Sequence, residues 1–273
     1  MQFAKINGNN IHYQEIGGPE GSPTLIFINS LGTDFRIWRD VIVRFVGDAS
    51  ILAYDKRGHG LSDVGNAPYT IEDHAEDLAG LIDLMGKKDV ILIGVSVGGL
   101  IAQSLYKIRP DLIKAMVLCD TAAKIGRSED WSDRISSVEI GGLDSLADAT
   151  MPRWFSEEFR KKHAAEVQGY RTMLARQPIN GYLGTCAAIR DADYNEDAKV
   201  ISVPTMCVVG LEDMSTTPEH MWDLASLIAG SRYEEMKNGA HLPFIEQPEN
   251  FANLVKDFIK NLNEPAPEGS SVH

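Results

Sequence analysis

The sequence lacks the motifs of several large classes of binding site. It has neither a GxxxxGK(S/T) phosphate-binding loop nor a GxGxxG dinucleotide fingerprint, and its seven histidines form no HxH or HExxH pair. The only cysteines are Cys119, Cys186 and Cys207, an odd number without a CxxC pair, so we expect reduced core residues rather than disulfides or a metal site. We therefore expect a protein without metal or nucleotide cofactor.

Positive charge and long apolar segments are also scarce. Lysine and arginine number 26 against 39 acidic residues, a net charge of −13, so the average field repels nucleic-acid phosphates and anionic membrane surfaces. Residues 1–10 lack the apolar run of a signal peptide, and the least polar stretch, residues 90–106, is too short to span a bilayer. We predict a cytoplasmic protein with neither nucleic acid nor membrane as a partner.

The sequence does contain a regular alternation of strand and helix patterns. Two short alternating runs, residues 2–6 and 11–15, flank residues 7–10, which have the composition of a hairpin turn. After them, helical patterns alternate with apolar runs typical of strands buried on both faces; these runs are residues 24–28, 51–54, 90–93, 115–119 and 205–209. This order predicts an α/β fold with a mainly parallel sheet and antiparallel N-terminal strands.

One long segment interrupts the alternation. Residues 121–200 have helical periodicity and many aromatics but no clear strand, and so long a connection usually has a function. We interpret it as a helical cap over the carboxyl ends of the sheet, where open α/β sheets bind ligands. Residues 1–120 and 201–262 then form the two parts of the core domain, and residues 263–273 form a flexible tail.

The clearest chemical signal is a GxSxG string centred on Ser96. Gly94 and Gly98 flank it between an expected strand and an expected helix at 100–108, and residues without a Cβ let strand and helix approach closely around a sharp turn. Such a turn exposes the serine hydroxyl beside the helix N-terminus, whose amides stabilise a developing oxyanion. The pattern predicts a serine nucleophile; a packing turn of small residues is the alternative.

A serine nucleophile needs a base and an acid that orients the base. His241 lies in a loop between an expected strand at 233–236 and the last expected helix, so we predict it as the base. Asp213 follows the run 205–209 and completes the chain order Ser, Asp, His. Asp120, directly after the run 115–119, remains a second candidate for the acid.

Acyl transfer also needs donors for the oxyanion. The amide of Val97, directly after the nucleophile, is one candidate, and the amide of Leu31, in the loop after the first buried strand, is the other. The glycine-rich loop 55–63 is interpreted as structural, a tight turn with a buried charge pair; a role in substrate binding is the alternative.

With these residues in this order, the chain except its tail resembles the α/β-hydrolase superfamily. Within it, residues 29–34 (NSLGTD), 151–155 (MPRWF) and 186–193 (CAAIRDAD) resemble the matching segments of the 3-oxoadipate enol-lactonases of the β-ketoadipate pathway of aromatic degradation. In two places the chain departs from them: Val97 stands where methionine is usual, and Asp120 where an uncharged polar residue is usual. The second departure keeps the identity of the acid open.

The resemblance implies a carboxylic ester hydrolase that opens a small anionic enol-lactone through an acyl-enzyme, without a cofactor. The substrate's carboxylate then needs a cation, for which Arg153 and Arg190 of the expected cap are candidates, with Arg153 preferred and Trp154 as a wall for the ring. Another carboxylesterase, a carbon–carbon bond hydrolase or a perhydrolase of the same fold is the alternative, and a receptor that binds its ligand without turnover is another. The cap aromatics are equally compatible with a core role.

Overall fold

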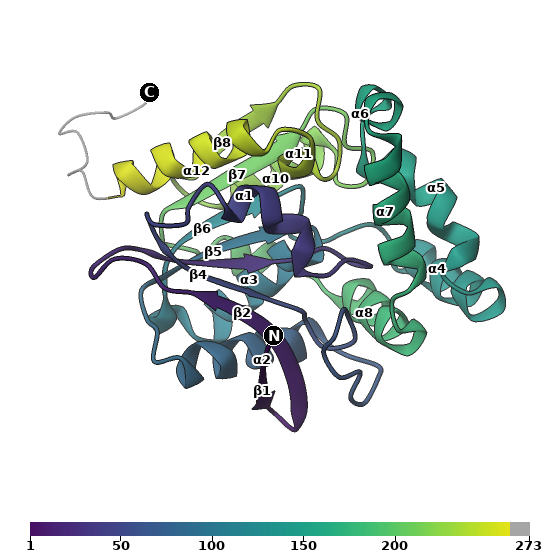
Figure 1. Cartoon of the computed structure of the whole chain (residues 1–273), viewed down its shortest axis with the longest axis horizontal. Coiled ribbons are helices and arrows are strands. Elements are labelled where there is room, and N and C mark those ends of the chain that lie inside the picture. Colours follow the sequence, from purple (N-terminus) through teal and green to yellow (C-terminus); the bar gives the residue numbers. More distant parts are fainter. Residues whose placement is uncertain (263–273) are drawn as a thin grey trace.

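An eight-stranded sheet organises residues 1–262, the part of the chain that this computed structural model describes (Figure 1). The strands lie in the order β1-β2-β4-β3-β5-β6-β7-β8. They are β1 (Gln2–Ile6), β2 (Asn9–Ile16), β3 (Thr24–Ile28), β4 (Ser50–Tyr54), β5 (Val90–Val95), β6 (Ile113–Cys119), β7 (Thr205–Gly210) and β8 (Arg232–Met236). β2 pairs antiparallel with β1 and β4, and the other pairs are parallel. The predicted sheet is confirmed.

The N-terminal hairpin is tighter than predicted. Ile6 pairs with Asn9, which leaves Asn7 and Gly8 as a two-residue turn, and both have positive φ, 47° and 85°. That combination is typical of the turn whose twist matches two antiparallel strands. Asn9 and Asn10, expected in the turn, already belong to β2.

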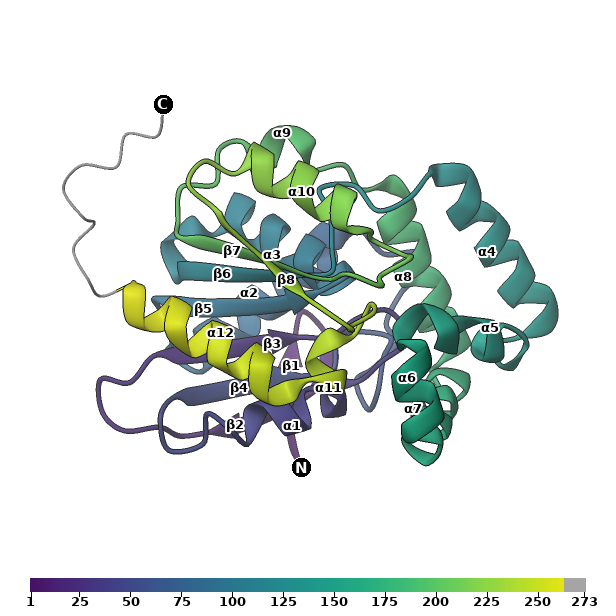
Figure 2. The ribbon, with the colours of Figure 1, turned by 90° about the horizontal axis from the view of Figure 1, so that it is seen from above.

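Helices cover both faces of the sheet (Figure 2). One face carries α1 (Arg39–Ile42), α11 (Pro243–Glu246) and α12 (Pro248–Asn261); the other carries α2 (Ile71–Leu84), α3 (Val97–Ile108) and α10 (Pro218–Leu227). α2 begins at a capping box in which the Thr70 side chain accepts from the backbone N–H of Asp73 and the Asp73 carboxylate accepts from that of Thr70. Its buried residues include Ala75, Leu78 and Ile82, one stripe at helical spacing.

The segment between β6 and β7 consists of helices and loops and contains no strand. It comprises α4 (Ser128–Gly141), α5 (Asp144–Trp154), α6 (Glu157–Lys162), α7 (Ala164–Ala175), α8 (Ile179–Asp191) and α9 (Asn195–Ala198). α4 to α8 gather at one end of the sheet and form the cap, whereas α9 lies beside α3 and α10 in the core layer (Figure 2). α9 therefore packs with the core helices, although residues 195–198 lie inside the segment predicted as the cap.

The cap docks on the loop 55–63 through backbone contact. A Cβ added to Gly181 of α8 would lie 2.1 Å from the carbonyl oxygen of Gly58, so glycine is required there. The Gly60 N–H also donates to Gln177 Oε1 at 2.9 Å. Arg57 of the same loop forms a buried charge pair with Asp77 of α2, Nε to Oδ2 2.6 Å, so the pair joins the loop to a helix rather than lying within the loop as predicted. The loop therefore supports the cap.

Two further predictions concern cysteine and membrane. Cys119, Cys186 and Cys207 are buried free thiols, as predicted. Within residues 1–262, no helix combines the length and the apolar character needed to cross a membrane. The predicted tail, residues 263–273, lies outside the described residues.

Candidate active site

Ser96 lies at a sharp turn between β5 and α3. Its backbone has φ 57° and ψ −121°, a conformation that a residue with a Cβ adopts only under strain. A Cβ added to Gly98 would lie 2.3 Å from the carbonyl oxygen of Ile28 on the neighbouring strand β3, so the helix can begin this close to the sheet only with glycine. The predicted strained turn is therefore present, and strain of this kind concentrates at functional sites.

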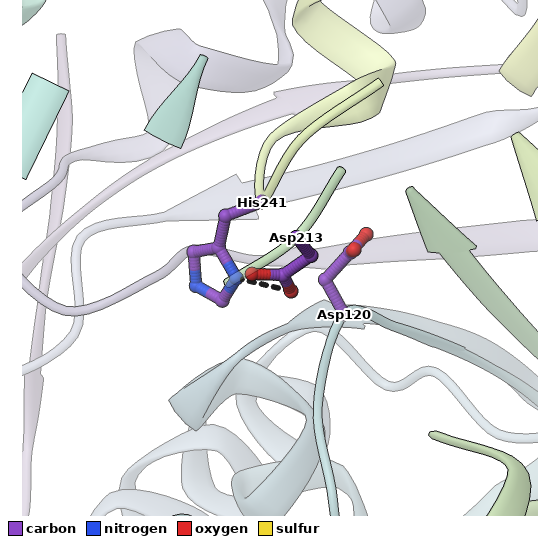
Figure 3. Close-up of side chains that lie close together, drawn as sticks. All are labelled: Asp120, Asp213 and His241. Atoms are coloured by element: carbon purple, nitrogen blue, oxygen red, sulfur yellow. Dashed lines mark hydrogen bonds and ion pairs between the residues drawn. The ribbon is translucent and has the colours of Figure 1, made fainter. Parts of the chain in front are cut away.

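His241 and Asp213 form a buried hydrogen-bonded pair (Figure 3). His241 Nδ1 lies 2.8 Å from Asp213 Oδ2. The Asp213 carboxylate also accepts from the Ser215 N–H at 2.7 Å and the Thr216 hydroxyl at 2.8 Å. Burial raises the pKa of Asp213. The charge and hydrogen bond of His241, together with the bonds from Ser215 and Thr216, lower it by more than burial raises it, so the pKa lies below its ordinary value. Asp213 therefore stays ionised and orients the imidazole.

Asp120 lies beside this pair without bonding to the histidine (Figure 3). Donor atoms of Asp120, Asp213 and His241 all lie within 4.8 Å of one another, as a metal site would require. Both oxygens of Asp120 already have protein partners, because Oδ1 accepts from the Gly210 N–H and Oδ2 accepts from Cys119 Sγ, each at 2.9 Å. Burial and then the charge of Asp213 raise the pKa of Asp120 well above its ordinary value. Of the two candidate acids, the geometry brings Asp213 to the histidine.

Ser96 and His241 line one cavity of about 450 Å³ between the sheet and the cap. Within the described residues no hydrogen bond joins the Ser96 hydroxyl to the imidazole, a contact that often tightens only when substrate binds. A larger cavity of about 850 Å³, between β2 and α7, contains His12 and Asp55 but none of these catalytic candidates. The smaller cavity is therefore the candidate active site.

One of the two predicted oxyanion donors, Leu31, borders the same cavity, and the other, Val97, directly follows Ser96. Ser30 and Leu31, in the loop after β3, line it together with Ser96. Val97 is the first residue of α3, so its N–H has no partner inside the helix and remains available. The structure thus brings the backbone of Leu31 and Val97 to the serine from two separate strand ends.

One of the two predicted cap arginines lines the cavity. Arg153 and Trp154, at the end of α5, both line the cavity, and Arg153 Nε donates to Ser215 Oγ at 3.2 Å. Arg190 does not reach it: it pairs with Asp191 at 2.8 Å and lines a different hollow. The residue of α8 that faces the active site is Tyr182, eight positions earlier, which is about 12 Å along a helix axis. The prediction for Arg190 is therefore corrected.

Arg134 is one of several cavity residues that were not predicted from the sequence. Its Nε donates to the Tyr182 hydroxyl at 2.8 Å, and its guanidinium lies over the Trp131 ring, 5.7 Å from the centroid. Among the described residues it has no carboxylate partner, unlike Arg190, although the chain is strongly acidic. A signal was present, since Trp131 and Arg134 are three residues apart and therefore share a helix face.

Comparison with known proteins agrees with this arrangement. The α/β hydrolase fold family matches residues 23–248. The chain is 33% identical over 248 residues to a 3-oxoadipate enol-lactonase of Acinetobacter baylyi, a match that covers 91% of this chain and 92% of that protein. The crystal structure of the enol-lactonase from Burkholderia xenovorans superposes with a TM-score of 0.91 at 35% identity, over 95% of this chain and all of the other. A pimeloyl-[acyl-carrier protein] methyl ester esterase of Neisseria meningitidis is 26% identical over 91% of this chain and 80% of its own length.

Proposed function

Because this chain belongs to the α/β hydrolase fold family, we propose that it is a serine hydrolase that opens 3-oxoadipate enol-lactone with water. The observation that carries the proposal is the convergence of three features on one cavity: the strained Ser96, the buried His241–Asp213 pair and an arginine without a carboxylate partner. The similarity to two enol-lactonases at 33% and 35% identity supports the choice of substrate.

The proposed reaction proceeds through an acyl-enzyme. Ser96 attacks the ring carbonyl while His241 accepts its proton, and Asp213 stabilises the imidazolium that forms. The amides of Leu31 and Val97 hold the tetrahedral oxyanion. The ring oxygen leaves as an enolate, which departs more readily than an alkoxide, and the proton held by His241 passes to this leaving group, so the imidazole is neutral again. Water activated by His241 then releases the open-chain product.

Substrate recognition in this proposal depends on Arg134. A guanidinium binds a carboxylate through two parallel hydrogen bonds, and stacking on an aromatic ring fixes its plane. Arg134 is held by Tyr182 and Trp131, so it loses little freedom when the anion binds. Arg153 is exposed and contributes a second positive charge at the edge of the cavity. Trp154, which is buried, forms an apolar wall.

The test is hydrolysis by the purified protein. We expect rapid loss of the ultraviolet absorbance of 3-oxoadipate enol-lactone, slower hydrolysis of 4-nitrophenyl acetate, and loss of both activities in Ser96→Ala. Ser104→Ala is the matched control, because Ser104 is a fully buried serine on the same helix outside the cavity; it should retain both.

The outcomes separate the proposal from its alternatives. Fast ester hydrolysis with an inert lactone would replace the lactonase with another carboxylesterase. Tight binding of the lactone without turnover would identify a receptor. Activity that survives in Ser96→Ala would contradict the serine mechanism itself.

A further inference from the structure

Lys56 is a fully buried lysine without a carboxylate partner. It follows β4, is 1% exposed, and forms no ion pair within residues 1–262. Burial lowers the pKa of Lys56 to about 7, against the opposing charges of Asp55 and Asp34. Moving an amine from water into the protein interior is unfavourable unless its hydrogen bonds are replaced. The hydrogen-bond partners of Lys56 Nζ therefore show which part of the protein this lysine holds in place.

Its principal partner is the carbonyl of Ser30. Lys56 Nζ donates to this oxygen at 2.6 Å and lies 3.5 Å from the Asn29 carbonyl oxygen. The Thr33 hydroxyl donates to the same Ser30 oxygen at 2.9 Å, and the Thr33 N–H lies 3.4 Å from it. Two donating side chains therefore fix one peptide group of the loop after β3.

This peptide group is the one that carries the N–H of Leu31. A peptide unit is planar and trans, so the N–H points opposite to the carbonyl. Because the carbonyl of Ser30 faces the buried Lys56, the N–H of Leu31 points away from Lys56, which does not line the cavity that Ser30 and Leu31 border with Ser96. Fixing one end of the peptide fixes the other.

The following peptide is held from the same loop. The Gly32 N–H donates to His59 Nε2 at 3.0 Å, and His59 is fully buried. Loop 55–63 thus holds peptides on both sides of Leu31, through Lys56 and His59. The Leu31 N–H itself donates to no group within residues 1–262, which leaves it for a substrate atom.

We propose that Lys56 is a positioning residue for hydrolysis, which orients and polarises the Ser30–Leu31 peptide so that the Leu31 N–H stabilises the oxyanion. The inference rests on the proposed function, in which Leu31 is an oxyanion donor. A donor bonded to a carbonyl oxygen draws electron density from the amide and strengthens its N–H as a donor. A dipole already fixed before reaction needs no reorganisation as charge develops.

The test compares Lys56→Met with Thr33→Val. Methionine fills the space of the lysine stem but cannot donate, and the Ser30 carbonyl keeps the Thr33 hydroxyl, so we expect a folded protein. Thr33→Val removes the neutral donor from the same oxygen and leaves Lys56 in place. The probe substrate is 4-nitrophenyl acetate, an activated ester that acylates the nucleophilic serine of such hydrolases whatever their natural substrate.

Two quantities report on the oxyanion site. The first is kcat. The second is the affinity for phenylboronic acid, to whose boron the Ser96 oxygen adds while its proton passes to His241, giving a negatively charged tetrahedral adduct. Removing a whole oxyanion donor lowers kcat by about 10²- to 10³-fold. Since Lys56→Met leaves the Leu31 donor in place but held by Thr33 alone, we expect about a tenfold fall in kcat and in boronate affinity, with KM within about twofold. Thr33→Val should cost less, about threefold.

The outcomes are decisive for Lys56. An unchanged kcat in folded Lys56→Met would overturn the proposal. A fall in kcat matched by a rise in KM with unchanged boronate affinity would also overturn it, as would failure to fold, because either result would assign Lys56 a purely structural role. Ser96→Ala separates this inference from the proposed function: if that variant is inactive while Lys56→Met is unaffected, only the role of Lys56 fails.

Discussion

The substitution Arg134→Met tests how the cavity selects its substrate. Methionine keeps much of the apolar stem and removes the guanidinium, whose partners within the protein are the Tyr182 hydroxyl and the Trp131 ring. A charge-assisted hydrogen bond contributes about 1.5–3 kcal/mol, so two bonds to a substrate carboxylate contribute about 3 kcal/mol even at the lower end. At 1.36 kcal/mol per factor of ten, this corresponds to a loss of about 150-fold in kcat/KM for the carboxylated lactone.

The assay is the ratio of kcat/KM for the enol-lactone to kcat/KM for 4-nitrophenyl acetate. Arg134→Met should lower this ratio by about two orders of magnitude, while ester hydrolysis changes little because the ester carries no carboxylate. Arg153→Met should lower it by at most about fivefold, since exposed charge pairs contribute about 1 kcal/mol or less.

Arg171→Met is the matched control. Arg171 lies on α7 of the same cap, binds Asp144 and Asp148, and does not line the cavity. Its replacement should leave the ratio unchanged. Equal losses on lactone and ester in Arg134→Met would refute anion recognition by Arg134.

Three further predictions concern the acids and the base. Asp213→Asn should lower kcat by about 10⁴-fold, the loss expected when the imidazole is held in the wrong tautomer, whereas Asp120→Asn should lower it by less than about tenfold in the same ester assay; the reverse order would make Asp120 the acid. His241→Ala should abolish the burst of 4-nitrophenol that marks acyl-enzyme formation, and a persistent burst would contradict its role as base. Asp120 has a raised pKa, so its folded form holds a proton that the unfolded chain loses above about pH 4; folding stability falls as pH rises above that value. Between pH 4.5 and 8, the melting temperature of Asp120→Asn should therefore rise relative to that of the parent protein as the pH increases. A difference in melting temperature that does not change with pH would contradict the raised pKa of Asp120.

The sequence was most informative where a residue's environment is set by its neighbours along the chain. The buried parallel strands appear as apolar runs because both of their faces are covered, and β3 was predicted to the residue. Ser96 was found because the GxSxG turn is local, with its glycines two positions away. Asp213 was preferred to Asp120 on chain order alone, because each follows one of two adjacent strands, β7 and β6, and both carboxylates meet at the same sheet edge. Only the hydrogen bond to His241 distinguishes them.

The sequence was least informative for the cap. Which side of α4 or α8 faces the serine depends on how these helices dock, and docking depends on contacts such as Gly58 with Gly181, more than a hundred residues apart. Arg190 was therefore chosen and Arg134 missed, although both lie on cap helices. The contact of Lys56 with Ser30 spans 26 residues between two loops, and no periodicity predicts it.

The loop 55–63 has a consequence for anyone who exchanges caps between related hydrolases to change their specificity. It touches the cap through Gly58 and Gly60 and the strand-end loop through Lys56 and His59. A transplanted cap that displaced Gly58 and Gly60 would also displace Lys56 and His59. The chimera would then hydrolyse every ester more slowly, instead of changing its preference among substrates. Grafts should therefore keep residues 177–184, the cap's side of this junction, from the parent chain.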